Sequence, residues 1–401
     1  MAKTTIDQVD VASKRVLVRV DFNVPLEGGT IADDRRIQAA IPTIRSITDR
    51  GGRAILMSHL GRPEGDGYEE SSSLEPVAAR LAELLGTPVA FPSHDCIDAA
   101  AAAAVQAMKD ADVLLLENLR FHKHEKNGNP GFAAKLAAYA DVYVNDAFGT
   151  CHRKDASMVA VPKAMEGKPR VAGFLVANEI RTIGDALSSP ARPFAVVLGG
   201  VKVSDKIGAI RNMLDKADHV LIGGAMAYTF CKALGQNVGA SKVEDDKLGV
   251  ARELIDKAAN LNVDAYLPVD HVCSTQFARI GGDVQIFDQH VKDGYIGLDI
   301  GPKTQSQYAS ILRKARTIIW NGPMGVFEWA PFAVGTQQIA AAIADATRAG
   351  ATSIVGGGDT AAAAEKFEIA DKVTHVSTGG GATLAMLAGE TFESVELLDD
   401  A

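Results

Sequence analysis

The stretch Pro193–Lys206 reads P-F-A-V-V-L-G-G-V-K-V-S-D-K and lies near the middle of the chain. Its first part, Phe194–Leu198, is a short apolar run rich in valine, which is typical of a parallel strand covered on both faces. The pair Gly199–Gly200 follows, and glycines at the end of a strand let a ligand approach the backbone closely. Lys202 and Lys206 are spaced so that a helix starting here would place both ammonium groups on one face. The stretch predicts a buried strand leading into a polyphosphate site; the alternative is an ordinary strand-to-helix turn with two solvated lysines.

The composition argues against several classes of protein. The chain has 401 residues, of which 47% are hydrophobic, so it can bury large cores, and its length favours two or more domains. The net charge of -9 argues against a general binder of nucleic acid or anionic membranes. The four cysteines are widely spread without C-x-x-C spacing, which indicates neither a zinc site nor a disulfide framework and fits a reducing cytoplasm. With no signal-peptide pattern and no apolar run of membrane-span length, we expect a soluble cytoplasmic protein.

Short runs rich in Val, Ile and Leu alternate with Ala-rich amphipathic stretches, a pattern typical of repeated βαβ units on parallel sheets. The first half has six strand candidates: Arg15–Phe22, Arg53–His59, Pro88–Phe91, Asp112–Glu117, Asp141–Asn145 and Val171–Val176. The second half also has six: Phe194–Leu198, His219–Ile222, Asp264–Leu267, Thr317–Trp320, Thr352–Val355 and Thr374–Val376. Between the two sets, Ala177–Leu187 has helical spacing. The sequence therefore predicts an α/β protein of two doubly wound domains joined by a connecting helix.

The predicted strand ends of the first half are basic. In open α/β sheets ligands bind beyond the carboxyl ends of the strands, where this half reads R-V-D-F-N-V-P (Arg19–Pro25), S-H-L-G-R-P (Ser58–Pro63), E-N-L-R-F-H (Glu117–His122) and N-D-A-F-G-T-C-H-R (Asn145–Arg153). A guanidinium binds phosphate or carboxylate in bidentate fashion, so these ends predict a small, highly anionic substrate. For any single arginine a structural salt bridge is the better explanation, but four basic strand ends in one domain argue against that explanation for the set.

The predicted strand ends of the second half are rich in glycine. They read G-G-V-K (Gly199–Lys202), G-G-A-M-A (Gly223–Ala227), N-G-P-M-G-V-F-E (Asn321–Glu328), G-G-G-D-T (Gly356–Thr360) and S-T-G-G-G-A-T (Ser377–Thr383). Backbone amides freed by glycine, with a helix N-terminus behind them, form an anion cradle. Asp359 and Thr360 could hold a magnesium ion and a phosphate oxygen. Asp359 could equally be the N-cap of a helix.

One motif suggests a different enzyme. No P-loop sequence occurs, but Gly356, Gly358 and Ala361 fit the G-x-G-x-x-[GA] fingerprint of dinucleotide-binding proteins. The acidic residue expected at the end of the next strand is missing, since Val376 and Ser377 stand there. An NAD-dependent oxidoreductase is therefore the alternative function.

Taken together, these motifs resemble those of the phosphoglycerate kinase family. The resemblance runs in family order and spacing from R-V-D-F-N-V-P to S-T-G-G-G-A-T and covers nearly the whole chain. It implies two Rossmann-like domains that close about a hinge, and reversible phosphoryl transfer from 1,3-bisphosphoglycerate to MgADP, giving 3-phosphoglycerate and MgATP. The implied divisions are an N-terminal phosphoglycerate-binding domain (1–176), a connecting helix and hinge (177–190), a C-terminal nucleotide-binding domain (191–385) and a tail packing back on the N-terminal domain (386–401). We expect a monomer whose partners are these small molecules.

The resemblance also assigns residues to roles. The phosphoglycerate would be bound by Asp21, Phe22, Asn23, Arg36, His59, Leu60, Gly61, Arg62, Arg120 and Arg153. The nucleotide would be bound by Gly200, Lys202, Lys206, Gly224, Gly297, Asn321, Glu328, Gly357, Gly358, Asp359 and Thr360, with Gly379, Gly380 and Gly381 as a phosphate cradle. Arg36, Lys202 and Lys206 would be catalytic. Glu328 would hold the ribose, and Asp359 would hold Mg²⁺ through the nucleotide.

The sequence departs from the family's usual residues at a few positions. Val201 and Ala225 replace smaller residues near the nucleotide base, so the base preference is open. Lys154 and Asp155 replace Ala-His and alter the charge beside the phosphoglycerate site. The tail segment Glu390–Leu398 lacks the family's L-P-G, which leaves its docking open.

Overall fold

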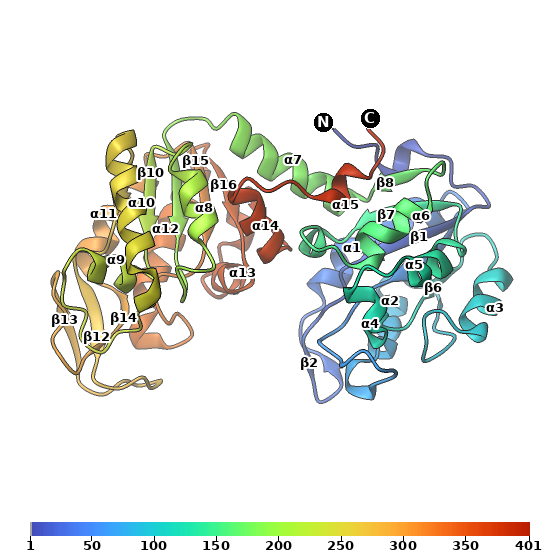
Figure 1. Ribbon diagram of the computed structural model, residues 1–401, viewed down its shortest axis with the longest axis horizontal. Helices are drawn as coiled ribbons and strands as arrows, with labels where there is room; N and C mark the ends of the chain where they lie inside the picture. The colour runs from blue at the N-terminus through green and yellow to red at the C-terminus, as the bar shows by residue number, and fades with distance from the viewer. Residues whose placement is uncertain (1) are drawn as a thin grey trace. The chain divides into compact units, whose positions relative to one another are not determined.

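The computed structural model describes residues 2–401, which form two compact units (Figure 1). The first unit comprises the chain up to Arg181 together with Thr391–Ala401, which we call the C-terminal segment, and the second comprises Thr182–Glu390. Each unit contains a six-stranded sheet in which all neighbouring strands are parallel, with helices flanking it. Helix α7 (Phe174–Ser188) carries the chain from one unit to the other. The predicted fold class is thus confirmed. Among the described residues, no helix is long and apolar enough to cross a membrane.

The sheet of the first unit has the strand order β5-β6-β4-β1-β7-β8. Its strands are β1 (Arg15–Val20), β4 (Arg53–Met57), β5 (Val89–Ala90), β6 (Val113–Leu115), β7 (Val142–Asp146) and β8 (Arg170–Ala172). The helices are α1 (Arg35–Thr48), α2 (Glu75–Leu85), α3 (Ala99–Ala107), α4 (Lys123–Lys126), α5 (Pro130–Ala137) and α6 (Val161–Ala164). On the central strand β1, Val18 pairs with Leu56 of β4 and Val144 of β7, and all three are fully buried. Fully buried strands explain the continuous apolar runs in the sequence.

The sheet of the second unit has the strand order β11-β10-β9-β15-β16-β17. Its strands are β9 (Phe194–Leu198), β10 (His219–Ile222), β11 (Asp264–Tyr266), β15 (Thr317–Asn321), β16 (Thr352–Val355) and β17 (His375–Val376). The helices are α8 (Ile207–Met213), α9 (Ala227–Ala233), α10 (Leu248–Leu261), α11 (Pro302–Leu312), α12 (Val334–Arg348), α13 (Gly358–Lys366) and α14 (Gly380–Leu387). Trp320 on β15 is the largest fully buried side chain, and it packs in a core with Val197 and Ile339.

Each sheet has one point at which the strand order reverses. In the first unit β4 lies beside β1 on one side of the β1–β7 pair, and β8 lies beside β7 on the other side. In the second unit β10 lies beside β9 on one side of the β9–β15 pair, and β16 lies beside β15 on the other side. At such a switch point the following loops diverge and leave an opening beyond the carboxyl ends of the strands. The segments after β1, β7, β9 and β15 are therefore where the topology favours ligand binding.

Some elements were not predicted or were predicted with wrong bounds. An antiparallel sheet of β12 (His271–Ser274), β13 (Val284–Phe287) and β14 (Ile296–Ile300), and a hairpin of β2 (Leu26–Glu27) and β3 (Thr30–Ile31), were missed. Most of β13 is exposed, so it lacks the apolar run that marks a buried strand. The predicted strand Val171–Val176 was wrong beyond β8, because α7 begins at Phe174. The side chain of Asp146 accepts hydrogen bonds from the backbone N–H groups of Leu175 (2.9 Å) and Val176 (3.4 Å). These two N–H groups of the first turn of α7 have no partner within the helix, so Asp146 stabilises the start of α7.

The C-terminal segment packs within the first unit, beside the start of the chain (Figure 1). Asp399 links β8 to the first residues of the chain. Its N–H donates to the Arg170 carbonyl at 2.7 Å, and its carbonyl accepts from the Thr4 N–H at 2.9 Å. In α15 (Glu393–Glu396), the buried Ser394 hydroxyl donates to the Cys151 carbonyl at 2.7 Å. The first unit is therefore completed by residues from both ends of the chain.

Candidate functional site

Two loops beyond the carboxyl ends of the first sheet, those after β1 and β4, are tied together by side chains. Asp21 follows β1 and is buried, and its Oδ2 accepts a hydrogen bond from Arg36 Nη1 of α1 at 2.8 Å. Asn23 lies two residues further, and its Oδ1 accepts from the Gly61 N–H, also at 2.8 Å. Gly61, on the loop after β4, has φ +64, a conformation that suits glycine. These bonds fix the loops after β1 and β4 relative to Arg36.

A neutral histidine lies among arginines in the same unit. His59 is buried, and its Nδ1 lies 3.1 Å from Arg19 Nη2. Burial lowers the pKa of His59 well below its usual value, and the positive charges of four arginines, Arg19, Arg120, Arg153 and Arg36, lower it further. The imidazole is therefore neutral at physiological pH, and the guanidinium groups around it supply a concentrated positive field that suits a small anion.

Arg120 lies on a short 3-10 turn, η3 (Leu119–Phe121), and is mostly buried. Its Nη1 donates to the Gly61 carbonyl at 2.9 Å, and its Nη2 lies 3.7 Å from the buried carboxylate of Asp155. Burial lowers the pKa of Arg120, and the charge of Arg153 adds to this effect. Among the described residues, Arg120 Nε and Asp155 Oδ2 are buried without a hydrogen-bond partner. Asp155, one of the departures noted in the sequence, is thus an acid placed against a cation of the basic cluster.

The remaining predicted residues of the first unit have different environments. Phe22 and Leu60 are buried and contribute backbone groups, since their N–H groups donate to Ser58 Oγ at 2.9 Å and to Asn118 Oδ1 at 3.2 Å. Arg62 is exposed on the loop after Gly61. The structure therefore brings most of the predicted set together, with Arg62 exposed next to it.

Arg19 was quoted in the sequence motif but given no role. It is fully buried within β1, where its Nε donates to Ser157 Oγ at 2.8 Å and a guanidinium nitrogen contacts the Val20 carbonyl. Ser157 Oγ in turn donates to the buried carboxylate of Glu125 at 2.5 Å. The signal for Arg19 was present, because an arginine inside an otherwise apolar strand must have polar partners.

In the second unit, the glycine turns after β9, β10 and β15 pack backbone against backbone. The Gly200 N–H donates to the Pro323 carbonyl at 3.0 Å, and the Gly224 N–H donates to the Met324 carbonyl at 3.0 Å. A Cβ on Gly224 would lie 2.5 Å from the Gly200 backbone, and a Cβ on Gly199 would lie 2.1 Å from the Pro323 carbonyl oxygen. Glycine is required here because three strand ends converge with no room for side chains.

Lys202 and Lys206 do not share a helix face, so that part of the prediction was wrong. Helix α8 begins only at Ile207, with Lys206 at its N-cap, while Lys202 is exposed on the preceding loop. The helix starts late because the loop is held elsewhere: the Ser204 N–H and hydroxyl donate to the carboxylate of Glu244 at 3.1 and 2.6 Å.

Lys206 and Asn321 connect two loops at the switch point of the second sheet. Lys206 Nζ donates to Asn321 Oδ1 at the end of β15. Burial lowers the pKa of Lys206 to about 8, against the opposing effect of nearby Asp205 and Asp359. A partly buried ammonium group that donates to an amide oxygen can gain energy from an anionic ligand.

Two helix N-termini lie beside Asn321. Helix α13 follows β16, and its N-cap is Gly357, so Asp359 is an exposed residue of the first turn and the N-cap alternative was wrong. Thr360 Oγ1 accepts from the Gly322 N–H at 2.7 Å. A Cβ on Gly380, the first residue of α14, would lie 2.9 Å from Gly357 Cα, so the turns after β16 and β17 are in contact. The first N–H groups of a helix have no partner within that helix, so two adjacent helix N-termini suit phosphate.

The predicted nucleotide residues outside these turns are more scattered. Gly358 is exposed in the first turn of α13, whereas Gly379 is buried just before α14 and Gly381 is exposed within it. Gly297 lies on β14, where a Cβ would meet Tyr228 Oη at 1.8 Å. Glu328 is exposed, and its backbone carbonyl accepts from Lys366 Nζ at 3.3 Å. Val201 is 53% exposed on the loop after β9.

The donor set fits a magnesium ion carried by a nucleotide. Asp359 offers an exposed carboxylate, and its charge favours the protonated form of Lys206, raising the pKa of that group against the effect of burial. Magnesium is usually bound by one or two carboxylates plus substrate phosphates.

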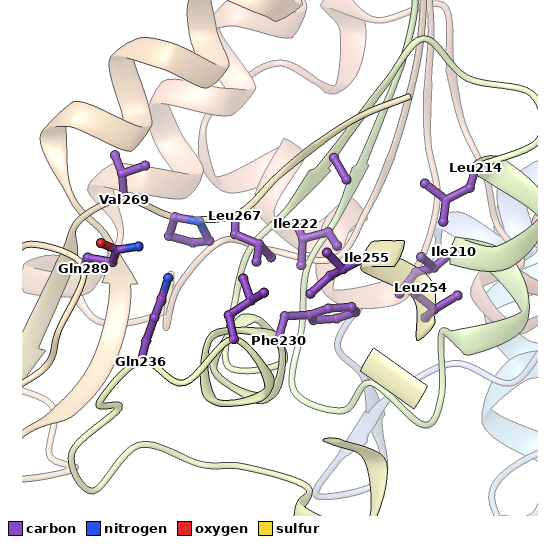
Figure 2. Close-up of a pocket in the computed structure, with 13 residues that line it drawn as sticks. Ile210, Leu214, Ile222, Phe230, Gln236, Leu254, Ile255, Leu267, Val269 and Gln289 are labelled. Atoms are coloured by element: carbon purple, nitrogen blue, oxygen red, sulfur yellow. The ribbon is translucent and has the colours of Figure 1, made fainter. Parts of the chain in front are cut away.

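An apolar pocket of about 260 Å³ lies elsewhere in the second unit. Figure 2 shows apolar side chains of α8, α9 and α10 around it, with the amide groups of Gln236 and Gln289 at one end. None of the predicted nucleotide residues lines this pocket, and an apolar lining does not suit a polyphosphate. The lining residues are Ile210, Leu214, Ile222, Phe230, Leu234, Gln236, Leu254, Ile255, Ala265, Leu267, Pro268, Val269 and Gln289.

Comparison with known proteins identifies the family. The sequence profile described as phosphoglycerate kinase matches residues 6–390. The chain belongs to the phosphoglycerate kinase family. It is 56% identical to the phosphoglycerate kinase of Rhodopirellula baltica over 404 aligned positions, with all of both chains covered. It is 47% identical to a protein of Trypanosoma congolense named cytosolic phosphoglycerate kinase, with 99% of this chain and 98% of that protein covered.

Solved structures of phosphoglycerate kinases have the same fold. The structure from Coxiella burnetii matches with a TM-score of 0.87 at 37% identity, covering 98% of both chains. The structure from Pyrococcus horikoshii matches with a TM-score of 0.84 at 34% identity, covering 99% of this chain and 98% of that one. The chain is accordingly a phosphotransferase of glycolysis, and the oxidoreductase alternative is not supported. Phosphoglycerate kinases act on a phosphoglycerate and on ADP or ATP, generally with Mg²⁺.

Proposed function

We propose that this chain transfers a phosphoryl group directly between 1,3-bisphosphoglycerate and MgADP, with the phosphoglycerate on the first unit and the nucleotide on the second. Four arginines around the neutral His59 support the first assignment, since a small anion with a phosphate and a carboxylate matches their charge. This arginine cluster is the single observation that carries the proposal. We further propose that the enzyme is a cytoplasmic monomer that has only small-molecule partners.

For the nucleotide, we propose that its phosphates bind at the N-termini of α13 and α14, with Lys206 between them and the loop after β9. The contact between the turns after β16 and β17 supports this, because it brings together two helix N-termini, whose first N–H groups have no partner within the helix. Asp359 would hold Mg²⁺, which when bound neutralises charge on the nucleotide phosphates. Gly200, Gly224 and the exposed Val201 would line the base side, and Glu328 would contact the ribose.

The proposed mechanism is in-line transfer without a covalent enzyme intermediate. No covalent chemistry is required of the protein in such a transfer, so catalysis comes from positioning and charge stabilisation. Arg36, held by Asp21 at 2.8 Å, would face the transferring group from the first unit, and Lys202 would face it from the second. Closure about the hinge would bring the reactants together and exclude water.

The test measures the reverse reaction with 3-phosphoglycerate and MgATP, coupled to glyceraldehyde-3-phosphate dehydrogenase and followed by NADH oxidation. We expect turnover that requires both substrates and magnesium. Arg36→Ala should lower kcat by about a hundredfold or more while leaving MgADP affinity nearly unchanged, because the residue lies in the other unit. Arg35→Ala is the matched control, since the neighbouring Arg35 is an exposed first residue of α1 that pairs with Asp33, which precedes the helix. Loss of MgADP binding equal to the loss of turnover would contradict the role given to Arg36.

A further inference from the structure

Three side chains of different chemistry converge on the first unit, outside the residues assigned above. Asp95 and Cys96 lie on the loop between β5 and α3, and His122 directly follows η3. A carboxylate oxygen, the Cys96 Sγ and a ring nitrogen of His122 all lie within 4.8 Å of one another. An oxygen, a thiol sulfur and an imidazole nitrogen are together the donor types that zinc selects.

The His122 and Asp95 donor atoms already face each other. His122 Nε2 lies 3.1 Å from Asp95 Oδ1, and the same oxygen accepts the Ile97 N–H at 2.8 Å. The His122 ring packs against Phe132 with 5.2 Å between ring centroids. Zinc bonds of about 2.0–2.3 Å place neighbouring donor atoms about 3.3–3.8 Å apart in a tetrahedral site. The separation of the His122 and Asp95 donors is already close to that spacing, and the sulfur, within 4.8 Å of both, has to move by at most about 1.5 Å.

A metal ion has a route to two of the three donors, Asp95 and His122. A cavity of about 530 Å³ adjoins it, lined by Asp95, Ile97, Asp98, His122, His124, Asn129, Gly131, Phe132 and Lys135. The side chains of Asp95 and His122 are 38% and 21% exposed, whereas Cys96 is fully buried and does not line the cavity. The open side leaves room for water as a fourth ligand, and His124 is a further donor on the same wall.

We propose that Asp95, Cys96 and His122 form a zinc-binding site, with water completing the coordination. On binding, the Cys96 thiol proton is released to solvent as the Zn–S bond forms, and zinc takes the place of the hydrogen bond between His122 and Asp95. The cysteine spacing in the sequence gave no sign of such a site, because its donors come from two segments and only one of them is a cysteine.

The test titrates the full-length, metal-free protein with Zn²⁺ by calorimetry and with Co²⁺ by absorption spectroscopy, in the absence of nucleotide. We expect one zinc ion per chain and, with cobalt, a sulfur-to-metal charge-transfer band together with the intense visible bands of a four-coordinate site. Cys96→Ser should abolish the charge-transfer band. His122→Gln and Asp95→Asn should each weaken zinc binding by about tenfold or more.

Cys273→Ser is the matched control, since Cys273 is also a buried free cysteine but lies in the other unit. It should keep the band and the affinity. Asp95→Asn changes a partly exposed side chain, so it tests the site even if substitution of the buried Cys96 disturbs folding. Absence of stoichiometric zinc binding by the wild type, a cobalt band that survives in Cys96→Ser, or unchanged affinity in Asp95→Asn would overturn the proposal. These measurements read metal binding directly and do not depend on the phosphotransferase assay.

Discussion

Lys206 has a pKa that makes nucleotide binding depend on pH. Burial lowers that pKa to about 8, and the phosphates of a bound nucleotide would raise it again by favouring the charged ammonium. Above about pH 8 the free enzyme holds Lys206 mostly neutral, so binding of MgADP must take up a proton. We therefore predict that the affinity for MgADP falls as the pH rises through about 8, with net proton uptake on binding.

The proton uptake can be measured by calorimetry of MgADP binding in buffers of different ionisation enthalpy. Lys206→Arg is the comparison variant, because arginine stays protonated across this range and should flatten the pH dependence. If the wild type and Lys206→Arg show the same pH dependence, a group other than Lys206 takes up the proton.

Asp155 places a negative charge inside the basic cluster. Its carboxylate lies 3.7 Å from Arg120 Nη2 and opposes the binding of an anion by the same guanidinium. We predict that Asp155→Asn lowers the KM for 3-phosphoglycerate by about fivefold, corresponding to about 1 kcal/mol, with little change in kcat. The variant should also be less stable, because Arg120 is buried and loses its counter-charge.

The measurement is steady-state kinetics at varied 3-phosphoglycerate and saturating MgATP. Asp141→Asn serves as the control, since Asp141 pairs with Arg15 at 3.0 Å at the start of β7, away from the carboxyl ends of the strands. A KM that rises in Asp155→Asn would mean that Asp155 positions Arg120 for the substrate rather than competing with it.

The turns after β9, β10 and β15 pack tightly against one another. Gly224 and Gly235 both have positive φ values, +66 and +81, but only Gly224 has backbone atoms in the way of a Cβ. We predict that Gly235→Ala costs about 1–2 kcal/mol of unfolding free energy through backbone strain alone. Gly224→Ala should cost at least about 2 kcal/mol more, because the turns must separate, and should also weaken MgADP binding.

Urea unfolding with and without MgADP would measure both effects. Gly235→Ala should retain the wild-type response to nucleotide. Equal destabilisation by the two substitutions would indicate that the turns after β9 and β10 separate easily and are not tightly packed.

Elements were predicted well where the pattern of their own residues determined them. They were predicted less well where contacts with distant segments determined where an element begins or ends. Strand β9, which is buried along its whole length, follows from its apolar run alone. The start of α8 could not be predicted from its own residues. Glu244, forty residues downstream, binds Ser204, and the helix begins only after that loop. The basic cluster was predictable as a set of arginines, but the neutral state of His59 and the partners of Arg19 depend on distances that no spacing encodes.

At the scale of the whole molecule, the C-terminal segment belongs to the first unit although the second unit precedes it in the chain. Its hydrogen bonds to Thr4 and Arg170 add backbone pairing to the edge of the first sheet, and Leu398 is buried. We predict that deletion of residues 391–401 lowers the melting temperature of the first unit by several degrees or more and leaves that of the second nearly unchanged.

Calorimetry should separate the two units, because MgADP is expected to raise only the transition of the second. Ser394→Ala removes a single buried hydrogen bond and provides a graded comparison, with an expected loss of about 1 kcal/mol. A deletion that lowers both transitions equally would mean that the segment stabilises the two units together.

The pairing of the two ends of the chain also orders events during translation. A ribosome produces the first part of the first unit, then the whole second unit, and only then Thr391–Ala401. Domains usually fold as they emerge, so the second unit can reach its native state while the first still lacks its last hydrogen-bonded residues. A nascent chain that stalls before Thr391 therefore leaves the Arg170 carbonyl of β8 without its Asp399 partner, a difference that quality-control factors recognising unpaired backbone can detect.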